Sequence, residues 1–271
     1  MIDLRQGDCL ELMKDIPDKS IDMILCDLPY GTTACKWDTI IPFEPLWEQY
    51  ERVIKDNGAI VLFGSQPFTS NLVMSNIKNY RYDWIWHKNS SGSFATAKKM
   101  PMKYHENISV FYKKLPTYNP QFQPYAKSVG ERFKDGEKVN RKKQFNNSTN
   151  SLQGGLSFEG TQPIDTKRGK YPESVQFFKS EHNANGKRLH PTQKPVALCE
   201  YLIKTYTNEG ETVLDNCMGS GTTGVACVRT NRNFIGIELA ETYFNIAKER
   251  IKNTKRQESL LEIEGKREWL Y

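Results

Sequence analysis

The feature that most constrains the fold is a glycine-rich stretch in the last quarter of the chain, Gly219-Ser220-Gly221-Thr222-Thr223-Gly224. It comes shortly after the strand pattern Val213-Leu214-Asp215 and precedes a helical pattern, and Glu238 ends the next strand pattern 23 residues after Asp215. Glycines between a strand and a helix let the backbone approach a ligand, and an acidic side chain ending the second strand accepts hydrogen bonds from ribose hydroxyls. The stretch predicts a site for NAD, FAD or S-adenosylmethionine, and it lacks the Gly-Lys-Ser/Thr of a P-loop.

The position of this stretch determines how the sheet is completed. Only 33 residues follow Glu238, too few for the remaining strands of a dinucleotide-binding fold, so the N-terminal segment must supply them. Strand patterns are expected at 21–26, 59–63, 81–87, 107–112, 212–214 and 234–237. Helical patterns are expected at 46–54, at 195–206, from the glycine-rich stretch to 229, and at 241–252. Alternation of this kind predicts an α/β fold with a doubly wound, mostly parallel sheet.

A second turn, Asp27-Leu28-Pro29-Tyr30, follows the strand pattern at 21–26. In a sheet completed in this way, the turn lies at the same carboxyl edge as the glycine-rich stretch. An exocyclic amino group of a base is a poor nucleophile, because its lone pair is delocalised into the ring. Asp27 and the backbone carbonyl of Leu28 can accept its two N–H hydrogens, while Pro29 fixes the turn and Tyr30 stacks on the base. Such a base must be flipped out of a duplex, at a cost of roughly a few kcal/mol.

Positive charge is concentrated in the middle of the chain. The net charge is +6, and residues 113–188 contain 15 Lys and Arg against 7 Asp and Glu, so the rest of the chain has a net charge of −2. Aromatic residues are interspersed among these basic residues, more than a disordered segment needs. We interpret 113–188 as an irregular lobe that contacts a polyanion, the alternative being a solvated basic loop.

Cysteine and hydropathy patterns limit the remaining classes. Six cysteines occur without a Cys-x-x-Cys pair, and the four histidines do not cluster with them, so we expect reduced thiols and no metal site. No run of about 18 apolar residues occurs, and the first residues lack the layout of a secretory signal. We therefore expect a cytoplasmic protein that does not contact a membrane.

Together these motifs resemble the β-class amino-methyltransferases of DNA, the N6-adenine and N4-cytosine family that uses S-adenosylmethionine. The family's D-P-P-Y appears as Asp27 to Tyr30, its D-x-F-x-G-S-G-T as Asp215 to Thr222, and its H-P-T-Q-K-P as His190 to Pro195. Smaller similarities, at Trp86-His87-Lys88 and His105-Glu106, carry no assigned role. Two residues depart from the family pattern: Leu28 replaces a proline, and Cys217 replaces an aromatic residue beside the cofactor.

The resemblance implies a sheet of the Rossmann-like methyltransferase type with an inserted irregular target-recognition lobe. Residues 1–112 would carry the target-amine motif, 113–188 would recognise the target, and 189–271 would form the cofactor-binding half. Asp27, Leu28, Pro29 and Tyr30 would be catalytic. S-adenosylmethionine would be the cofactor, S-adenosylhomocysteine the product, and Lys194 could pair with the methionine carboxylate. The implied cofactor-site residues are Asp8, Thr192, Lys194, Asp215, Gly219, Ser220, Gly221, Thr222 and Glu238.

The predicted function is site-specific methylation of adenine N6 in duplex DNA by base flipping and direct transfer. Asp rather than Ser at position 27 favours adenine, and N4-cytosine methylation is the alternative. An RNA or protein amide methyltransferase is a second hypothesis, although those families place the cofactor glycines first. A nucleic-acid-binding module with an inactive site is a third, and the intact Asp27, Tyr30 and Glu238 argue against it. The expected partner is double-stranded DNA, and the family is compatible with a homodimer and a cognate restriction endonuclease.

Overall fold

The computed structural model describes residues 1–32, 38–124, 169–180 and 193–254. It divides into two compact units, one made of 1–119 and 173–271 and the other of 120–172. In the described part of the second unit, an isolated bridge pairs Gln123 with Lys170, and the ring of Phe122 lies 4.9 Å from that of Tyr171. Most of the predicted segment 113–188, and the first three residues of the His190 to Pro195 motif, lie outside the described residues.

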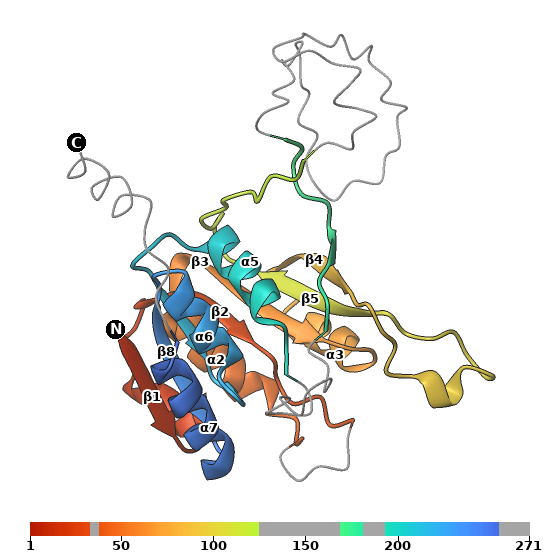
Figure 1. The fold of residues 1–271 in the computed structure, drawn as a ribbon. Helices are drawn as coiled ribbons and strands as arrows, with labels where there is room; N and C mark the ends of the chain where they lie inside the picture. The colour runs from red at the N-terminus through yellow and green to blue at the C-terminus, as the bar shows by residue number, and fades with distance from the viewer. Residues whose placement is uncertain (33–37, 125–168, 181–192, 255–271) are drawn as a thin grey trace, which may run out of the picture. The chain divides into compact units, whose positions relative to one another are not determined.

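An eight-stranded sheet forms the centre of the first unit (Figure 1). Across the sheet the strands are β1 (Ile2–Gln6), β8 (Asn233–Glu238), β7 (Thr212–Asp215), β2 (Ile21–Cys26), β3 (Ile54–Gly64), β5 (His105–Phe111), β4 (Tyr80–His87) and β6 (Val175–Phe177). Among these strands only β5 is antiparallel to its neighbours, and every other pairing is parallel. The prediction of a mostly parallel α/β sheet is confirmed.

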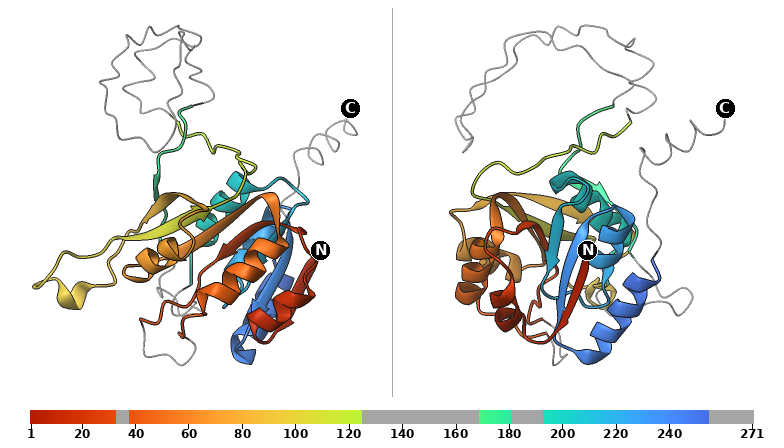
Figure 2. Two further views of the ribbon diagram at one scale, coloured as in Figure 1. Left: turned by 180° about the vertical axis from the view of Figure 1, so that it is seen from behind. Right: turned by 90° about the vertical axis from the view of Figure 1, so that its left-hand side faces the viewer.

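Helices cover both faces of the sheet, as the two further views show (Figure 2). One face carries α1 (Cys9–Leu12), the 3-10 turn η1 (Met13–Asp15), α2 (Phe43–Val53) and α3 (Phe68–Ser75). The other face carries α5 (Val196–Tyr206), α6 (Thr222–Arg229) and α7 (Glu241–Lys252). The short 3-10 helix η2 (Phe94–Thr96) lies between β4 and β5.

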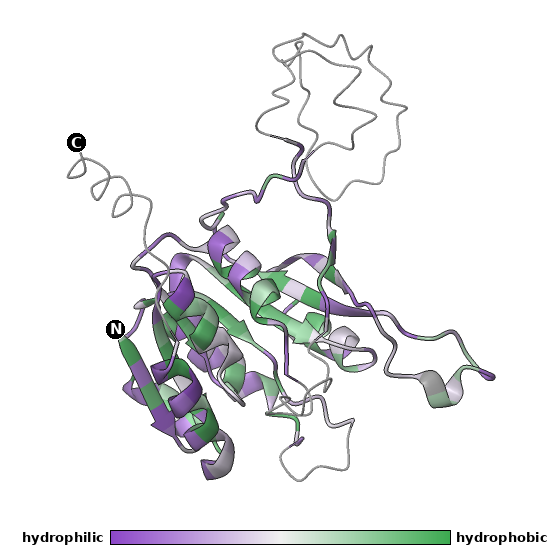
Figure 3. Ribbon diagram, in the orientation of Figure 1, coloured by the Kyte–Doolittle hydropathy of each residue, from purple (hydrophilic) through white to green (hydrophobic). Residues whose placement is uncertain are grey.

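Strand β2 is buried on both faces, which explains its uninterrupted apolar sequence. Met23 and Leu25 pack in the cluster that contains α5, α6 and α7, whereas Ile24 and Cys26 pack in the cluster that contains α2. A parallel strand covered by helices on both sides has this composition. The inner strands of the sheet are accordingly coloured as hydrophobic in Figure 3.

Strands from the N-terminal and C-terminal parts of the chain lie side by side in this sheet. Met23 pairs with Val213 and Ile24 with Leu214, so β2 of the N-terminal part lies directly beside β7 of the C-terminal part. The parallel register places the residue after β2, Asp27, and the last residue of β7, Asp215, at the same carboxyl edge. This arrangement confirms that the N-terminal segment completes the sheet.

Several elements differ from the predictions. The helix expected to reach Ile54 ends at Val53, and β3 begins at Ile54 because this residue is extended and pairs with Ile21. Helix α3 was not predicted. Strand β6 lies within the segment 113–188 but joins the sheet beside β4, so the inserted unit, 120–172, has narrower limits than that segment. Among the described residues, no helix is both long enough and apolar enough to cross a membrane.

Candidate active site

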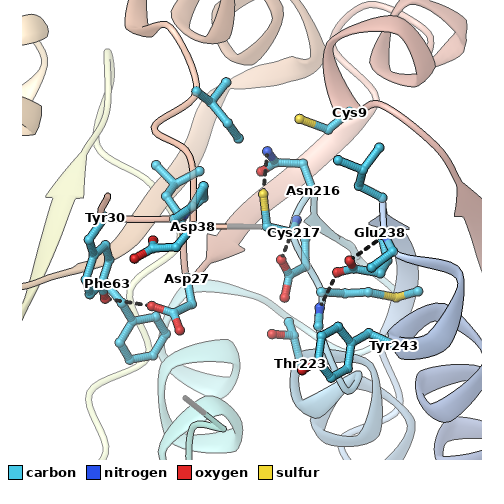
Figure 4. A pocket seen from close by; sticks show the side chains of 18 of the residues that line it. Cys9, Asp27, Tyr30, Asp38, Phe63, Asn216, Cys217, Thr223, Glu238 and Tyr243 are labelled. Carbon is cyan, nitrogen blue, oxygen red and sulfur yellow. Dashed lines mark hydrogen bonds between the residues drawn. The ribbon is translucent and has the colours of Figure 1, made fainter. Parts of the chain in front are cut away.

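A cavity of about 430 Å³ lies at the carboxyl edge of the sheet and is lined from both halves of the chain (Figure 4). Its walls include the loop after β1, the turn after β2, the glycine-rich stretch after β7 and the residues after β8. A ligand of ordinary cofactor size needs a cleft of roughly 300–1,000 Å³. The cavity is therefore large enough to hold one.

Most of the predicted site residues line this one cavity. They are Asp8, Asp27, Leu28, Pro29, Tyr30, Lys194, Asp215, Gly219, Ser220, Thr222 and Glu238. Gly221 is not among the lining residues, and it serves as the N-cap of α6. Thr192 lies outside the described residues. The spatial inference from the sequence, that two motifs almost two hundred positions apart share one pocket, is therefore confirmed for the described residues.

The glycine-rich turn depends on two glycines with positive φ. Gly219 has a φ of 50° and Gly221 a φ of 76°, a region that residues with a Cβ rarely adopt. The turn is tied to β8 because the Gly219 amide donates to Oε2 of Glu238 at 2.9 Å. Arg250 of α7 adds a second tie, since its guanidinium donates to the carbonyl of Ser220 and to Oγ1 of Thr222.

The cavity lining is acidic. Among the described residues it has five carboxylates, from Asp8, Asp27, Asp38, Asp215 and Glu238, and one ammonium, from Lys194. S-adenosylmethionine carries a sulfonium and an ammonium charge against a single carboxylate, so it is a net cation. Acidic walls favour such a cation electrostatically. The lining therefore matches this cofactor better than the negatively charged pyrophosphate of NAD or FAD.

Several of these carboxylates are also held by backbone amides. Asp8 caps α1, accepting from the Leu10 amide at 2.8 Å. Oε1 of Glu238 accepts from the Ala240 amide at 2.9 Å. Each carboxylate oxygen has two lone pairs, so both side chains retain acceptor capacity toward a ligand.

Asp215 is 3% exposed, and burial raises its pKa to about 6. Hydrogen bonds from Thr223 and from the Cys217 amide oppose this rise. The Asp215 carboxyl therefore keeps its proton to a higher pH than an exposed aspartate does.

Asp27 has a donor on each carboxylate oxygen. The Tyr30 hydroxyl donates to Oδ1 at 2.6 Å, as Figure 4 shows, and the Lys194 ammonium donates to Oδ2 at 2.6 Å. Burial raises the pKa of Asp27 above its usual value, and the positive charge of Lys194 limits the rise. Burial and the adjacent Asp27 raise the pKa of Tyr30 further above its usual range, so its hydroxyl remains a donor.

The ring of Tyr30 was predicted to stack on a base. In the structure it stacks on Phe68, with ring centroids 4.9 Å apart and planes inclined by 30°. Its hydroxyl orients Asp27, a role that the sequence analysis did not assign.

Lys194, which the resemblance assigned to the cofactor, is 7% exposed and contacts two carboxylates of the chain itself. Its Nζ lies 2.6 Å from Asp27 Oδ2 and 3.3 Å from Glu106 Oε2. Burial alone would lower the pKa of Lys194, but Asp27 and Glu106 raise it above its usual value. The ammonium is therefore a counter-ion of Asp27 in the turn after β2.

Other lining residues were not foreseen. Asp38 closes the loop after Tyr30, since its two carboxylate oxygens accept from the amides of Gly31 and Thr32 at 2.9 Å each. Asn216 accepts from the Tyr50 hydroxyl and is 2% exposed. Further lining residues are Cys9, Phe63, Gln193, Thr223 and Tyr243. Asn216, Gln193 and Thr223 stand within recognised motifs but were given no role, whereas Asp38, Phe63 and Tyr243 stand in no motif.

Within the described ranges, no group of three or more His, Cys, Asp or Glu residues could hold a metal ion. Of the five described cysteines, Cys26, Cys199 and Cys227 are buried, and Cys9 and Cys217 are partly exposed.

The fold and the cavity define a methyltransferase of the Rossmann-like class that uses S-adenosylmethionine. Comparison with known proteins identifies the family. The family model of N6 and N4 methyltransferases, described as DNA methylase, matches residues 21–249. The chain belongs to this family and is an S-adenosylmethionine-dependent DNA methyltransferase.

Two curated relatives align over most of the chain. The type II methyltransferase M.HpaI of Haemophilus parainfluenzae is 29% identical over 260 residues, which cover 90% of this chain and 72% of that protein. The DNA adenine methyltransferase YhdJ of Escherichia coli K12 is 29% identical over 259 residues, which cover 90% of this chain and 81% of YhdJ.

Solved structures agree on the fold. The M1.HpyAVI–SAM complex has a TM-score of 0.59 at 25% identity, covering 93% of this chain and 99% of that one. The cytosine-N4-specific PvuII DNA methyltransferase has a TM-score of 0.63 at 15% identity, covering 96% and 95% of the two chains, and this likeness supports the fold alone.

Proposed function

We propose that this chain transfers a methyl group to the N6 amino group of adenine in duplex DNA, at a base flipped into the cavity beside Asp27. The observation that carries the proposal is the presence of Asp27 and of the Asp215 to Glu238 cofactor elements in one cavity. When bound, S-adenosylmethionine supplies an electrophilic methyl group there. The protein then has to bring an amino nitrogen close to it with the correct orientation.

The turn after β2 would hold that amine. The Asp27 carboxylate and the backbone carbonyl of Leu28 would each accept one N–H hydrogen, which directs the nitrogen lone pair away from the ring system. Tyr30 keeps Asp27 in place through its 2.6 Å hydrogen bond. Pro29 restricts the turn, and the buried side chain of Leu28, 4% exposed, anchors it in the core.

The glycine-rich side of the cavity would hold the cofactor. Glu238 would accept hydrogen bonds from the ribose hydroxyls, and Asp8 and Asp215 would add negative charge near the cationic part of the ligand. Gly219, Ser220, Gly221 and Thr222 would form the turn against which the ligand lies. Lys194 and Thr192 complete the predicted set, and the ion pairs of Lys194 favour a role on the Asp27 side instead.

Adenine is favoured over cytosine by two facts. Position 27 is Asp, and the relative YhdJ is named a DNA adenine methyltransferase. Mass spectrometry of digested DNA from a host expressing the protein separates N6-methyladenine from N4-methylcytosine. Cytosine as the methylated base would contradict this part of the proposal.

The basic segment 113–188 would recognise the DNA target, and the flanking segments 1–112 and 189–271 would form the two halves of the catalytic domain. Several curated relatives, M.HinfI among them, are named type II methyltransferases. By analogy with these relatives, a cognate restriction endonuclease is a prediction for this chain. A homodimer is a separate prediction.

Replacing Asp27 tests the proposal most directly. Asp27→Ala should reduce transfer of tritiated methyl to duplex DNA by about 10³-fold or more, because the amine loses its acceptor. Asp27→Asn, which keeps the shape but exchanges an acceptor for a donor, should fail similarly. Binding of S-adenosylmethionine and of DNA should persist in both variants. Wild-type turnover by Asp27→Ala would refute the assignment.

A further inference from the structure

Behind the catalytic turn lies a network of four charged side chains from separate parts of the fold. Asp27 follows β2, Lys194 precedes α5, Glu106 is in β5 and Lys88 follows β4. The side chains of Lys194, Glu106 and Asp27 are 8%, 15% and 22% exposed. Lys88 forms an ion pair with Oε1 of Glu106. Two carboxylates and two ammonium groups make the network neutral overall.

The Lys194 ammonium takes up one of the acceptor positions of Asp27, on the side of the carboxylate that faces α5 and β5. It donates to Oδ2 at 2.6 Å while Tyr30 donates to Oδ1, so each oxygen already accepts a hydrogen bond from the protein. An ammonium N–H and an amine N–H are the same kind of donor. Each oxygen keeps one lone pair, and an amine that approaches Oδ2 shares this oxygen with the Lys194 ammonium and weakens its hydrogen bond.

Glu106 offers Lys194 a second acceptor. Its Oε2 is buried and, within the described part of the chain, receives no hydrogen bond. Lys194 Nζ already lies 3.3 Å from this oxygen. This contact is an ion pair without hydrogen-bond geometry, so a rotation of the lysine side chain that aims an N–H at Oε2 would satisfy a buried acceptor.

We propose that Lys194 and Glu106 are positioning residues for the target amine: the Lys194 ammonium occupies Asp27 in the absence of a base and moves onto Oε2 of Glu106 when the amine binds. In the second position the ammonium is still close enough to keep Asp27 ionised. Glu106 thus acts through Lys194 and does not contact the base. This inference rests on the proposed role of Asp27 as the amine acceptor.

Several groups around Asp27 influence its pKa. They are Tyr30 of its own turn, Lys194, Glu106 of β5, Cys26 of β2, Cys199 of α5 and Asp215 of β7. Burial raises the pKa of Cys26 to about 12 and that of Cys199 higher still, so both thiols stay neutral. Asp215 is unchanged in the variants described below, so it contributes equally to each pH profile. A difference between the pH profiles of two variants therefore comes from the residue that was replaced.

Lys194→Met tests the counter-ion. Without the ammonium, the pKa of Asp27 rises, so a larger fraction of Asp27 is protonated at neutral pH and cannot accept the amine. The single-turnover rate at saturating DNA and cofactor should fall about a hundredfold at neutral pH. The rising limb of its pH profile should move to higher pH. In alkaline solution Asp27 is ionised again, and this variant has no ammonium on it, so the rate should recover to at least the wild-type value.

Glu106→Gln tests the second position. Lys194 then has only Asp27 as an anionic partner and stays on it, so the same rate should fall about tenfold, equivalent to ~1.4 kcal/mol. Its rising limb should not move to higher pH, since removal of a nearby negative charge lowers the pKa of Asp27. Glu106→Asp, which keeps the charge, should restore most of the rate.

Affinity for S-adenosylmethionine and recovery of the rate at alkaline pH separate positioning from structural damage, and the affinity should stay within the range of the controls. The melting temperature should fall in Lys194→Met, because two buried carboxylates lose their shared cation. Lys114→Met and Asp56→Asn are suitable controls, because they break an exposed ion pair of 3.0 Å elsewhere on the protein. A wild-type rate in Glu106→Gln, or a Lys194→Met rate that alkaline pH does not restore, would overturn the inference. Turnover by Asp27→Ala would instead remove the proposed function on which it rests.

Discussion

The ionised carboxylate of Asp215 is unfavourable for the folded state at neutral pH. Its pKa is raised from 3.8 to about 6 by burial, so the folded state binds the proton more tightly than the unfolded state does. The stabilisation from this proton is present in full below pH 3.8 and is lost as the pH rises through 6. Asp215→Asn should therefore raise the free energy of unfolding at neutral pH by about 1–3 kcal/mol.

Urea unfolding at neutral pH and at pH ~5 checks this prediction, because the advantage of Asp215→Asn should shrink as the wild-type carboxyl takes up its proton. The same variant should bind S-adenosylmethionine more weakly, since the cavity loses one negative charge. Asp56→Asn on the surface should show neither effect. An equal gain at both pH values would mean that the charge of Asp215 is not the cause.

At the scale of residues, the sequence identified the groups that stand in motifs and missed those brought in by topology. Asp27, Asp215 and Glu238 each end or follow a strand beside a turn, so parallel strands place them at one edge. Glu106 lies near the start of β5, which runs antiparallel to its neighbours, so the beginning of this strand and not its end reaches that edge. The sequence does not show that β5 runs in the opposite direction, so no function could be assigned to Glu106 from the similarity at His105-Glu106.

Among the elements, α6 and α7 pack too closely at Gly221 to admit a side chain. A Cβ at this position would lie 2.9 Å from the Cβ of Ala247, and the φ of 76° is itself unfavourable for alanine. Gly221→Ala should lower the free energy of unfolding by about 1–3 kcal/mol. It should also weaken S-adenosylmethionine binding, because the turn from Gly219 to Thr222 has to shift.

Ala247→Gly, introduced together with Gly221→Ala, separates the two causes. The double variant removes the contact with the Cβ of Ala247 but keeps the backbone strain and the contacts with Ile251 Cδ1 at 3.0 Å and Ala247 Cα at 3.1 Å. It should therefore recover only part of the loss in chemical unfolding and in cofactor titration. Gly92→Ala is the matched control, since a Cβ there meets nothing within 4 Å. If Gly221→Ala were as stable as Gly92→Ala, the close packing of α6 on α7 would not matter.

Secondary structure was predictable where a regular pattern of apolar residues continued over a whole segment and ended in a recognisable turn. The expected limits of β2 and α7, 21–26 and 241–252, are those of the structure. Helix α3 was missed because it spans only eight residues and follows Pro67 without a side-chain cap. Strand β6 has three residues, and it is a strand because β4 pairs with it rather than because of its own sequence.

At the scale of the whole molecule, the unit 120–172 can be removed without cutting the sheet. It contains 10 Lys and Arg against 5 Asp and Glu. Its replacement by a short Gly-Ser linker keeps the hydrogen bond of Asn119 to Thr205 and the pairing of β6 with β4. The truncated protein should bind S-adenosylmethionine normally but bind duplex DNA at least about tenfold more weakly, with a shallower salt dependence.

Fluorescence anisotropy with labelled duplex at several salt concentrations measures this change. Calorimetric titration with S-adenosylmethionine provides the control for folding. DNA affinity equal to that of the intact chain would show that the phosphate contacts lie elsewhere and would contradict the proposed recognition role of the segment.

The adjacency of β2 and β7 has a consequence for the genetic architecture of such enzymes. No covalent link between these strands is needed to set their register, which comes from hydrogen bonds and from side chains packed on both faces. The order in which a gene encodes the amine-holding piece and the donor-holding piece is therefore free to change, provided the same strands remain neighbours. Circular permutation, or encoding as two separate polypeptides that associate, would preserve the chemistry.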